Sequence, residues 1–573
     1  TGFAMLNNAF TEASMHDMAT LVPVMYAVIL VFLVLLFRSV TATISTLGVI
    51  VLSTVATMGA AGWAGLELTP PSAIAPTLIM TLAVADSVHL LRGFLARLAL
   101  GDAKDSALVE SLRVNGWPIF LTSASTAIGF LSMNFSDSPP FHDLGNMTAF
   151  GVMAAFIISV SFLPAVVSLL PVRAPRRRRT SGERWDRLGA WVLGRRVPVL
   201  VITAAVAVAL TLSVPRNELN DEFVDYFASS VPFRADTDFA VERLTGIYQV
   251  EFSLGAGESG GVAEPAYLET LDRFAEYWRA QPGVLHVRTL ADTVRRINRS
   301  LHGDDPAYYR LPEGRELTAQ YLLLYELSLP YGLDLNDEIN VDKSATRFTV
   351  TLDDLSAKDL IAAAAAGEAW LEAEAPASMY ARGAGPALMF AHLAQRNIRG
   401  MLLGTFVALV LISALLMVAL RSWRYGLLSL IPNLAPAGMA FGIWALTVGQ
   451  INIALSMVVA MTLGIVVDDT VHFLAKYQRG RRERGLDADG AVRYAFRAAG
   501  GALFTTSAVL VAGFLVLSLS SFEMNAGMGR LTAVTIVMAL FTDFLLLPAL
   551  LATVDRPKAE AKRPLRAQPV TAP

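Results

Sequence analysis

The segment Met461-Thr-Leu-Gly-Ile-Val-Val-Asp-Asp-Thr-Val-His-Phe-Leu474 places two aspartates, Asp468 and Asp469, and a histidine, His472, inside an otherwise apolar run. An ionisable group at the depth of a bilayer costs roughly 2.5–3.5 kcal/mol on insertion scales, so such groups usually mark a path for ions or substrate. The segment therefore predicts a membrane helix that carries a functional site.

A looser copy of this segment occurs far upstream, as Met80-Thr-Leu-Ala-Val-Ala-Asp-Ser-Val-His-Leu-Leu91. When the two are aligned on their histidines, Asp86 matches Asp469 and His89 matches His472. Two copies of a costly buried motif indicate that the chain is built from two related halves.

The composition of the chain supports a membrane protein. Its 573 residues are 54% hydrophobic and only 17% charged, with a mean hydropathy of +0.50, whereas soluble domains average about 25% charged residues. The absence of cysteine excludes disulfides and thiolate metal sites. The sequence also lacks P-loop, HExxH and CxxC patterns, so ATP hydrolysis is not expected, and nothing in it predicts a nucleic-acid partner.

Eleven apolar runs are long enough to span a bilayer, which takes about 20 residues at 1.5 Å rise per residue. They lie near residues 19–37, 41–63, 71–91, 115–135, 146–171, 197–214, 398–420, 426–447, 451–475, 500–520 and 527–553. The sequence thus predicts about eleven transmembrane helices.

Matching residues of the two halves are separated by a nearly constant number of residues. Arg38-Ser39 matches Arg421-Ser422 at an offset of 383 residues, and Thr122-Ser123 matches Thr506-Ser507 at 384, so we expect one inserted residue in the loop between these points. Five helices of each half pair in the same order, which is the pattern of a parallel repeat about an axis along the membrane normal.

The placement of lysines and arginines predicts how the chain is oriented in the membrane, because short cytoplasmic loops carry an excess of these residues.

The predicted domains are 1–18, the tail of a missing first periplasmic domain; 19–171, the first five-helix repeat, resembling a sterol-sensing domain; 172–196, a basic cytoplasmic linker with the run Arg176–Arg179; 197–214, the first helix of the second repeat; 215–396, a periplasmic domain; 397–554, the second five-helix repeat; and 555–573, a cytoplasmic tail.

The periplasmic region has the pattern of an α+β domain. Strands are predicted at 247–254, 284–289, 346–352 and Ser378–Arg382, helices at 263–281 and 357–374, and a mostly helical insert at 290–340. Strand–helix–strand repeated twice predicts a ferredoxin-like split βαβ fold.

At this point the chain resembles the RND superfamily, and within it the branch of MMPL proteins, hopanoid and sterol transporters and Patched-like, sterol-sensing-domain proteins. The resemblance rests on Gly464–Asp469 with His472, on the upstream copy, on Asp543–Pro548, and on Asp221–Phe227. It covers nearly the whole chain, and it implies twelve helices and two outer domains.

The resemblance also implies that the acids of the two motifs relay protons that drive export. The predicted relay consists of Asp86, His89, Asp468, Asp469 and His472. Residues three or four apart share a helix face, so each acid can reach the histidine of its own helix. Ala85 stands where the second copy has Asp468, so the two halves of the relay are unequal. The alternative is a static hydrogen-bonded cluster that only holds two helices together.

Hydroxyl residues early in the helix after each motif are candidates to support the relay. Thr122, Ser123, Thr506 and Ser507 can hydrogen-bond the acids across helices or hold water, although membrane hydroxyls more often bond their own backbone. Asp543 has no acidic partner in the first half, and it either joins the relay or sits in partial water near the cytoplasmic end.

The stretch Gly257-Glu-Ser259-Gly-Gly261 matches the pattern of a hydrolase nucleophile elbow. An elbow leads directly into a helix and needs histidine and acid partners, whereas here the glycine-rich stretch continues before the next helix. A strand-to-helix loop is the favoured interpretation. No enzymatic activity and no cofactor is expected, with a proton gradient as the energy source.

These features predict an exporter of hydrophobic, lipid-like molecules (sterol, hopanoid or another lipid), driven by the proton-motive force. It would be a multi-pass protein of a bacterial inner membrane. Candidate partners are membrane lipids, the lipid substrate, a periplasmic lipid-binding protein and further copies of the chain. The alternatives are a sterol- or lipid-sensing receptor without active transport, and an accessory of protein export.

Overall fold

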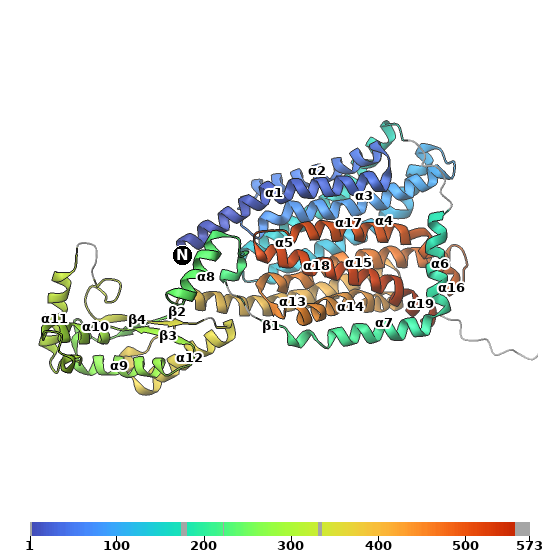
Figure 1. Ribbon diagram of the computed structural model, residues 1–573. Helices are drawn as coiled ribbons and strands as arrows, with labels where there is room; N and C mark the ends of the chain where they lie inside the picture. Colours follow the sequence, from blue (N-terminus) through green and yellow to red (C-terminus); the bar gives the residue numbers. More distant parts are fainter. Residues whose placement is uncertain are drawn as a thin grey trace, which may run out of the picture.

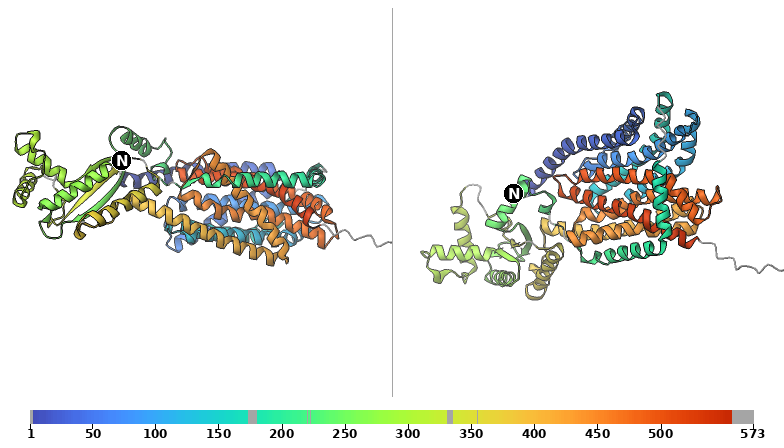
Figure 2. Two further views of the ribbon diagram at one scale, coloured as in Figure 1. Left: turned by 90° about the horizontal axis from the view of Figure 1, so that it is seen from below. Right: turned by 45° about the vertical axis from the view of Figure 1, so that its right-hand side comes forward.

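The computed structural model describes residues 3–172, 180–219, 221, 223–330, 335–353 and 355–555. The molecule is an elongated bundle of long helices with an α/β domain at one end (Figures 1 and 2). We call the end that carries this domain the domain end, and the opposite end of the bundle, where α6, α16 and α19 lie in Figure 1, the far end.

The bundle contains five long helical segments from each half of the chain. In the first half these are α1 (Phe3–Phe37), α2 (Val40–Trp63), α3 (Ala75–Ala99), α4 (Lys104–Leu131) and α5 (Pro139–Leu169). In the second half they are α13 (Pro386–Ala419), α14 (Trp423–Thr447), α15 (Ile453–Arg482), α16–η8–α17 (Ala488–Ala495, Phe496–Gly500 and Gly501–Leu517) and α18–η9–α19 (Glu523–Phe541, Thr542–Leu546 and Leu547–Val554).

Ten helices of the described part are long and apolar enough to cross a membrane, against the eleven predicted. The difference is α4, which forms where the span at 115–135 was expected and packs between α3, α5 and α15. Its buried face carries many serine and threonine hydroxyls.

The repeat is visible in the backbone at Arg38 and Arg421. Both adopt a left-handed conformation, with φ of 48° and 46°, which is uncommon for a residue with a side chain. The next residue in each case, Ser39 or Ser422, caps the following helix by accepting a hydrogen bond from a backbone amide. The predicted inserted residue is also present, because the loop after α3 spans 100–103 and the loop after α15 spans 483–487.

Helices α3 and α15 occupy the centre of the bundle. The most apolar 18-residue window of each is 89% buried, more than in any other candidate span. Helix α15 lies directly against α4, where a methyl group on Gly464 would come within 2.6 Å of the Thr126 backbone. The Thr126 hydroxyl donates to the Gly464 carbonyl at 3.1 Å. The absence of a side chain at Gly464 therefore allows the two halves to meet at backbone contact.

The two halves also interlock at the domain end. Ser136, after α4, contacts Asn397 of α13, and its counterpart Ser520, after α17, contacts Asp17 of α1. Asp17 also accepts hydrogen bonds from the amide and hydroxyl of Ser521. Residues 3–18, which the sequence analysis assigned to the tail of an outer domain, form the first turns of α1 and project toward the α/β domain (Figure 1).

The α/β domain contains a three-stranded antiparallel sheet in the order β2-β4-β3. Its elements are α8 (Pro232–Arg243), β2 (Tyr248–Gly255), α9 (Pro265–Arg279), β3 (Val284–Arg288), α10 (Leu290–Leu301), α11 (Arg315–Ser328), β4 (Ala345–Leu352) and α12 (Ala357–Glu374). The first three strands, both helices and the helical insert lie where the sequence predicted them.

The predicted fourth strand, Ser378–Arg382, is wrong. The chain turns as a short 3-10 helix over Ala377–Met379, and only Ala384 forms a single antiparallel bridge, to Glu251 of β2. Pro376 before this turn and Gly385 after it, with φ of 125°, leave too short an extended stretch for a strand. The ferredoxin-like sandwich therefore stays a prediction.

The segment that joins the halves is not an irregular linker. Helix α6 (Thr180–Gly194) lies across the far end of the bundle and contacts α16, η8 and α19, and α7 (Arg196–Thr211) then returns along the bundle (Figures 1 and 2). Beyond η3 (Val214–Arg216), β1 (Glu218–Leu219) pairs in parallel with β5 (Gln450–Ile451) before α15. The basic run Arg176–Arg179 and the tail beyond residue 555 lie outside the described residues.

Candidate functional site

Four carboxylates are buried in the centre of the bundle. Asp86 comes from α3, Asp468 and Asp469 come from α15, and Asp543 comes from the π-helical turn η9. Each has at most 8% of its surface exposed. The acids therefore lie among the helices by which the two halves of the repeat meet.

Two of these acids have the serine partners that the sequence predicted. The Ser123 hydroxyl of α4 donates to Asp86 at 3.2 Å, and the Ser507 hydroxyl of α17 donates to Asp469 at 2.6 Å. These are the same interaction in the two halves, because the acids and the serines are repeat partners. The neighbouring threonines, Thr122 and Thr506, donate to carbonyl oxygens of their own helices.

Asp543 lies inside the bundle and has no exposed surface, so the alternative that placed it in partial water is wrong. The Thr470 hydroxyl, on α15, donates to one oxygen of Asp543 at 2.8 Å, while the other oxygen has no hydrogen-bond partner in the described part of the chain. Asp543 is thereby tied to the helix that carries Asp468 and Asp469. Thr470 lies within the motif itself, and its hydroxyl directly after two acids was the pattern that could have identified it.

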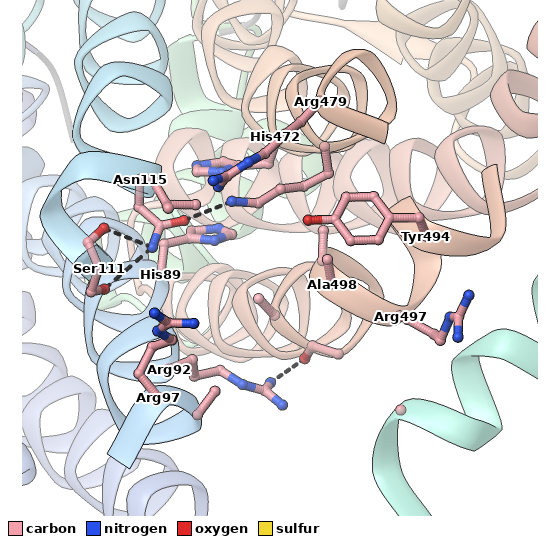
Figure 3. Close-up of a pocket in the computed structure, with 18 of the residues that line it drawn as sticks. His89, Arg92, Arg97, Ser111, Asn115, His472, Arg479, Tyr494, Arg497 and Ala498 are labelled. Atoms are coloured by element: carbon pink, nitrogen blue, oxygen red, sulfur yellow. Dashed lines mark hydrogen bonds between the residues drawn. The ribbon is translucent and has the colours of Figure 1, made fainter. Parts of the chain in front are cut away.

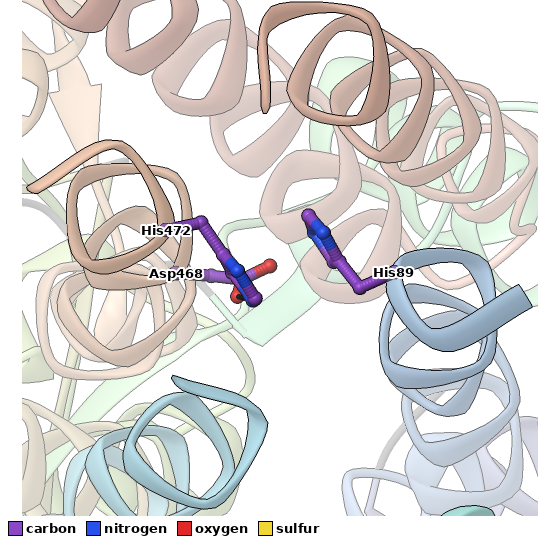
Figure 4. A group of neighbouring side chains, drawn as sticks. All are labelled: His89, Asp468 and His472. Carbon is purple, nitrogen blue, oxygen red and sulfur yellow. Dashed lines mark ion pairs between the residues drawn. The ribbon is translucent and has the colours of Figure 1, made fainter. Parts of the chain in front are cut away.

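The two motif histidines lie against each other across the interface of the halves. The rings of His89 and His472 are stacked, with centroids 3.7 Å apart and planes within 4° (Figure 4). The prediction that each acid reaches the histidine of its own helix holds for one pair: His472 Nε2 lies 3.4 Å from Asp468 Oδ1. It is wrong for Asp86 and Asp469, which bond to serines.

The histidines retain unused hydrogen-bonding capacity. Nε2 of His89 and both ring nitrogens of His472 are buried without a hydrogen-bond partner among the described residues. Buried polar atoms nearly always have hydrogen-bond partners, so these nitrogens mark a place at the centre of the bundle where a further partner is expected.

His89, Asp468 and His472 present ligand atoms within 4.8 Å of one another, which raises the question of a metal ion. Imidazole binds zinc through an in-plane lone pair at about 2.0–2.1 Å. The two rings are stacked, with centroids 3.7 Å apart and planes within 4° of parallel, so one ion cannot lie in both ring planes. In this arrangement the cluster does not fit a metal ion.

A lysine that the sequence analysis did not include extends the site toward the far end. Lys476 lies four residues beyond His472 on α15, so Asp468, His472 and Lys476 form one stripe on the helix. Its side chain is 8% exposed and its ammonium donates to Asn115 Oδ1 of α4 at 3.0 Å. The four-residue spacing between His472 and Lys476 was the feature of the sequence that could have identified this lysine as part of the site.

Taken together, the site is a column of titratable groups that runs along the interface of the halves. Carboxylates with hydroxyl donors occupy its middle, and the stacked histidines and Lys476 follow toward the far end. Protons can exchange among such groups, and each protonation changes the charge at the surface where the halves touch.

A separate apolar cavity of about 430 Å³ opens at the domain end, between α1, α13 and the start of α5. Its walls include Phe10, Met15, Phe141, Leu393 and Phe522. Aromatic and methionine side chains provide adaptable apolar surface, so this cavity suits a hydrophobic molecule.

One acid lies beside this cavity, outside the spanning helices. Asp221 is buried and accepts hydrogen bonds from the Tyr226 hydroxyl at 2.7 Å and from the Ile453 amide at 3.2 Å. Burial raises the pKa of the Asp221 carboxyl to about 6, against the lowering effect of these two hydrogen bonds. Asp221 thus connects the α/β domain to the first residue of α15.

A duplicated five-helix bundle with acids buried between its halves and a domain outside it defines a transporter of the RND type. The chain belongs to the MMPL family, whose sequence model matches residues 1–201 and 338–569. The unmatched stretch, residues 202–337, contains the later part of α7 and most of the α/β domain.

A curated protein with an MmpL name matches the sequence over nearly the whole chain. The chain is 23% identical over 589 residues to the heme uptake protein MmpL11 of Mycobacterium tuberculosis, which covers 97% of this chain and 56% of MmpL11. The chain thus spans about half the length of the curated relatives it matches.

Two solved structures share the fold. The hedgehog release protein Disp from the water bear Hypsibius dujardini has a TM-score of 0.66 at 14% identity, over 95% of this chain and 71% of Disp. A Thermus SecDF, a translocon-associated membrane protein, has a TM-score of 0.58 at 15% identity, over 96% of this chain and 63% of SecDF. The curated relatives are named as transport, uptake or export proteins, which is consistent with the expectation of a protein that is not an enzyme. Ser259 of the elbow-like stretch donates to the backbone carbonyl of Asp342, as a loop residue would.

Proposed function

We propose that this chain moves hydrophobic, lipid-like molecules out of a bacterial inner membrane and that a proton gradient drives the movement. The observation that carries the proposal is the burial of four carboxylates among the helices that join the two halves. A charge change at that place alters the contact between halves directly, which is what coupling of protons to a conformational change requires.

The energy available is adequate for such work. One proton that crosses a potential of 100 mV releases about 2.3 kcal/mol. A change of that size is enough to shift a two-state equilibrium between arrangements of the halves by more than tenfold. Each acid that alternates between the charged and the neutral form can therefore bias the arrangement of α3 against α15.

The apolar cavity at the domain end is the proposed entry for the cargo. It lies where α1 and α13 meet the α/β domain, and the apolar parts of both helices are largely exposed on the outside of the bundle, where lipid would contact them. A molecule that leaves the bilayer along these helices would reach the cavity without crossing water. The relative MmpL11 is named for the uptake of heme, another hydrophobic molecule.

The proposal includes an orientation. The α/β domain would face the periplasm and the basic far end the cytoplasm, because arginines and lysines gather at the far end. A periplasmic lipid-binding protein would receive the cargo, and the chain would act with further copies of itself.

The test is transport by the purified chain in proteoliposomes. Proteoliposomes with a fluorescent phospholipid or sterol in their membrane are given a pH gradient, and the transfer of this lipid to an acceptor protein outside the vesicles is measured. Transport should require the gradient and should be lost in Asp469→Asn. Asp105→Asn, which removes an exposed acid of α4, is the matched control and should transport normally.

Transport that proceeds without a gradient, or that is unchanged in folded Asp469→Asn protein, would contradict the proton-driven mechanism. Saturable lipid binding without any transport would favour the receptor alternative. Gradient-dependent movement of an unfolded polypeptide, rather than lipid, would favour an accessory of protein export.

A further inference from the structure

A second cavity, also of about 430 Å³, lies at the far end of the bundle beyond the stacked histidines (Figure 3). Side chains from α3, α4, α15, α16 and η8 line it, so it spans the interface of the two halves. His89 and His472 form its inner wall, and Trp185 of α6 lies at its edge.

The cavity is strongly basic. Six of its lining residues are cationic: Arg92, Arg97, Lys476, Arg479, Arg484 and Arg497. One lining residue, Glu110, is an acid. Cavity walls of one sign concentrate field lines and attract ions of the opposite sign.

Three of the six cations have acidic partners of their own. Arg97 pairs with Asp102 at 2.7 Å, Arg479 with Glu483 at 2.7 Å, and Arg497 with Asp186 at 3.4 Å. A fourth, Arg484, lies over the ring of Tyr494. These four have ordinary surface arrangements and need no ligand.

The remaining two, Arg92 and Lys476, have no ion pair among the described residues. The Arg92 guanidinium donates to neutral oxygens only, the Gly501 carbonyl and the Thr505 hydroxyl at 2.8 Å. The buried ammonium of Lys476 donates to the Asn115 amide oxygen. Lys476 is buried and Arg92 is half-buried, and a charge withdrawn from water is costly unless an opposite charge is paired with it; neither of these two cations has such a pair among the described residues.

From this arrangement we infer that the far-end cavity binds a phosphate-class anion. Arg92 provides a planar guanidinium that matches phosphate oxygens, Lys476 provides a point charge, and the imidazole nitrogens of His89 and His472 without hydrogen-bond partners offer further donors. The bound anion would bridge α3 to α15, that is, one half of the repeat to the other. The inference does not depend on the proposed transport function.

The anion can come from two sources with the same chemistry. Basic pockets between membrane helices bind phospholipid headgroups, and α6, which crosses the far end, is amphipathic, as expected of a helix at the depth of the headgroups. Free inorganic phosphate would meet the same side chains. The size of the cavity is within the range of small-molecule sites, so it accommodates either group.

The test is calorimetric titration of the purified full chain in a neutral detergent. The probes are inorganic phosphate and dihexanoyl phosphatidic acid, with dihexanoyl phosphatidylcholine, which has no net charge, as the comparison lipid. We expect saturable binding of at least one anionic probe. Loss of one charge-assisted hydrogen-bond partner should weaken that binding about tenfold or more in Arg92→Met and in Lys476→Met.

Two variants serve as controls. Lys476→Arg keeps the charge and should keep most of the binding, while Arg396→Met removes an exposed arginine at the domain end and should leave binding unchanged. Binding of phosphate identifies a free anion, and binding of phosphatidic acid alone identifies a headgroup.

The inference is overturned if wild-type protein binds neither anionic probe saturably, or if phosphatidylcholine binds as well as phosphatidic acid. It is also overturned if Arg92→Met and Lys476→Met bind like wild type. Each variant is first checked for a monodisperse elution profile. If Arg92→Met fails this check, Lys476→Met decides, since its folded-state contact is a single hydrogen bond to an amide.

Discussion

Replacement of Gly464 by alanine tests whether the halves meet at backbone contact. The new methyl group would lie 2.6 Å from Thr126 Cα and 3.1 Å from the Ser125 carbonyl oxygen. Carbon atoms in contact prefer about 3.5–4.0 Å, so α15 and α4 would have to separate by about 1 Å. That movement would also lengthen the hydrogen bond from Thr126 to the Gly464 carbonyl.

The expected magnitude follows from two opposing effects. Glycine to alanine within a helix gains about 1 kcal/mol, while insertion of a methyl group into a closely packed site costs about 1–3 kcal/mol. The lost interhelical hydrogen bond adds about 1 kcal/mol to the cost. We therefore expect Gly464→Ala to lower the free energy of unfolding by about 1–3 kcal/mol.

The assay is the unfolding midpoint in detergent, with Gly116→Ala as the matched control. Gly116 lies on α4 with nothing near its added methyl group, so its replacement should leave stability equal or slightly higher. A Gly464→Ala protein as stable as Gly116→Ala would refute the close approach of the two helices.

Three further predictions concern individual polar groups. Because the pKa of Asp221 is raised from 3.8 to about 6 in the folded protein, stability should fall by about 3 kcal/mol as pH rises from about 4 to 6. In Asp221→Asn this dependence should disappear, as measured by unfolding midpoints across that pH range. Thr470→Val leaves buried Asp543 without its donor and should cost about 1–3 kcal/mol in the same unfolding assay. His89→Phe keeps a ring against His472, so its unfolding midpoint should match wild type while gradient-driven lipid transport in vesicles falls.

Each of these predictions has a result that would contradict it. Equal pH profiles of wild type and Asp221→Asn would show that the carboxyl is not the titrating group. A loss in Thr535→Val, whose hydroxyl bonds its own helix, as large as in Thr470→Val would remove the special role of the Asp543 contact. Normal transport by His89→Phe would exclude that ring nitrogen from the proton path.

Much of the bundle could be predicted because a repeat and an apolar run can each be recognised from the order of residues along the chain alone. The offset of Asp86 from Asp469 paired the helices correctly, and it also placed Ser123 and Ser507 beside the acids. The limit was reached where contacts join distant segments. The three-residue spacing along one helix suggested that His89 interacts with Asp86, whereas the packing of the two halves stacks His89 on His472.

The residues that the sequence analysis missed or misplaced depend on packing in the same way. Asp543 has no acidic counterpart in the first half, so only the position of its π-helical turn determines that it is buried beside Thr470. Lys476 stands at the correct helical spacing, but a lysine near a helix end normally reaches water. Its burial results from α4, which covers it with Asn115.

The stacking of His89 on His472 also limits how much positive charge the pair can hold. Two imidazolium ions with centroids 3.7 Å apart would repel each other by about 4–5 kcal/mol at an effective dielectric constant of about 20. His89 and His472 therefore accept one positive charge between them at a time. In the proposed proton path, one proton would therefore have to leave this pair before the next one enters, whatever the number of carboxylates along the path.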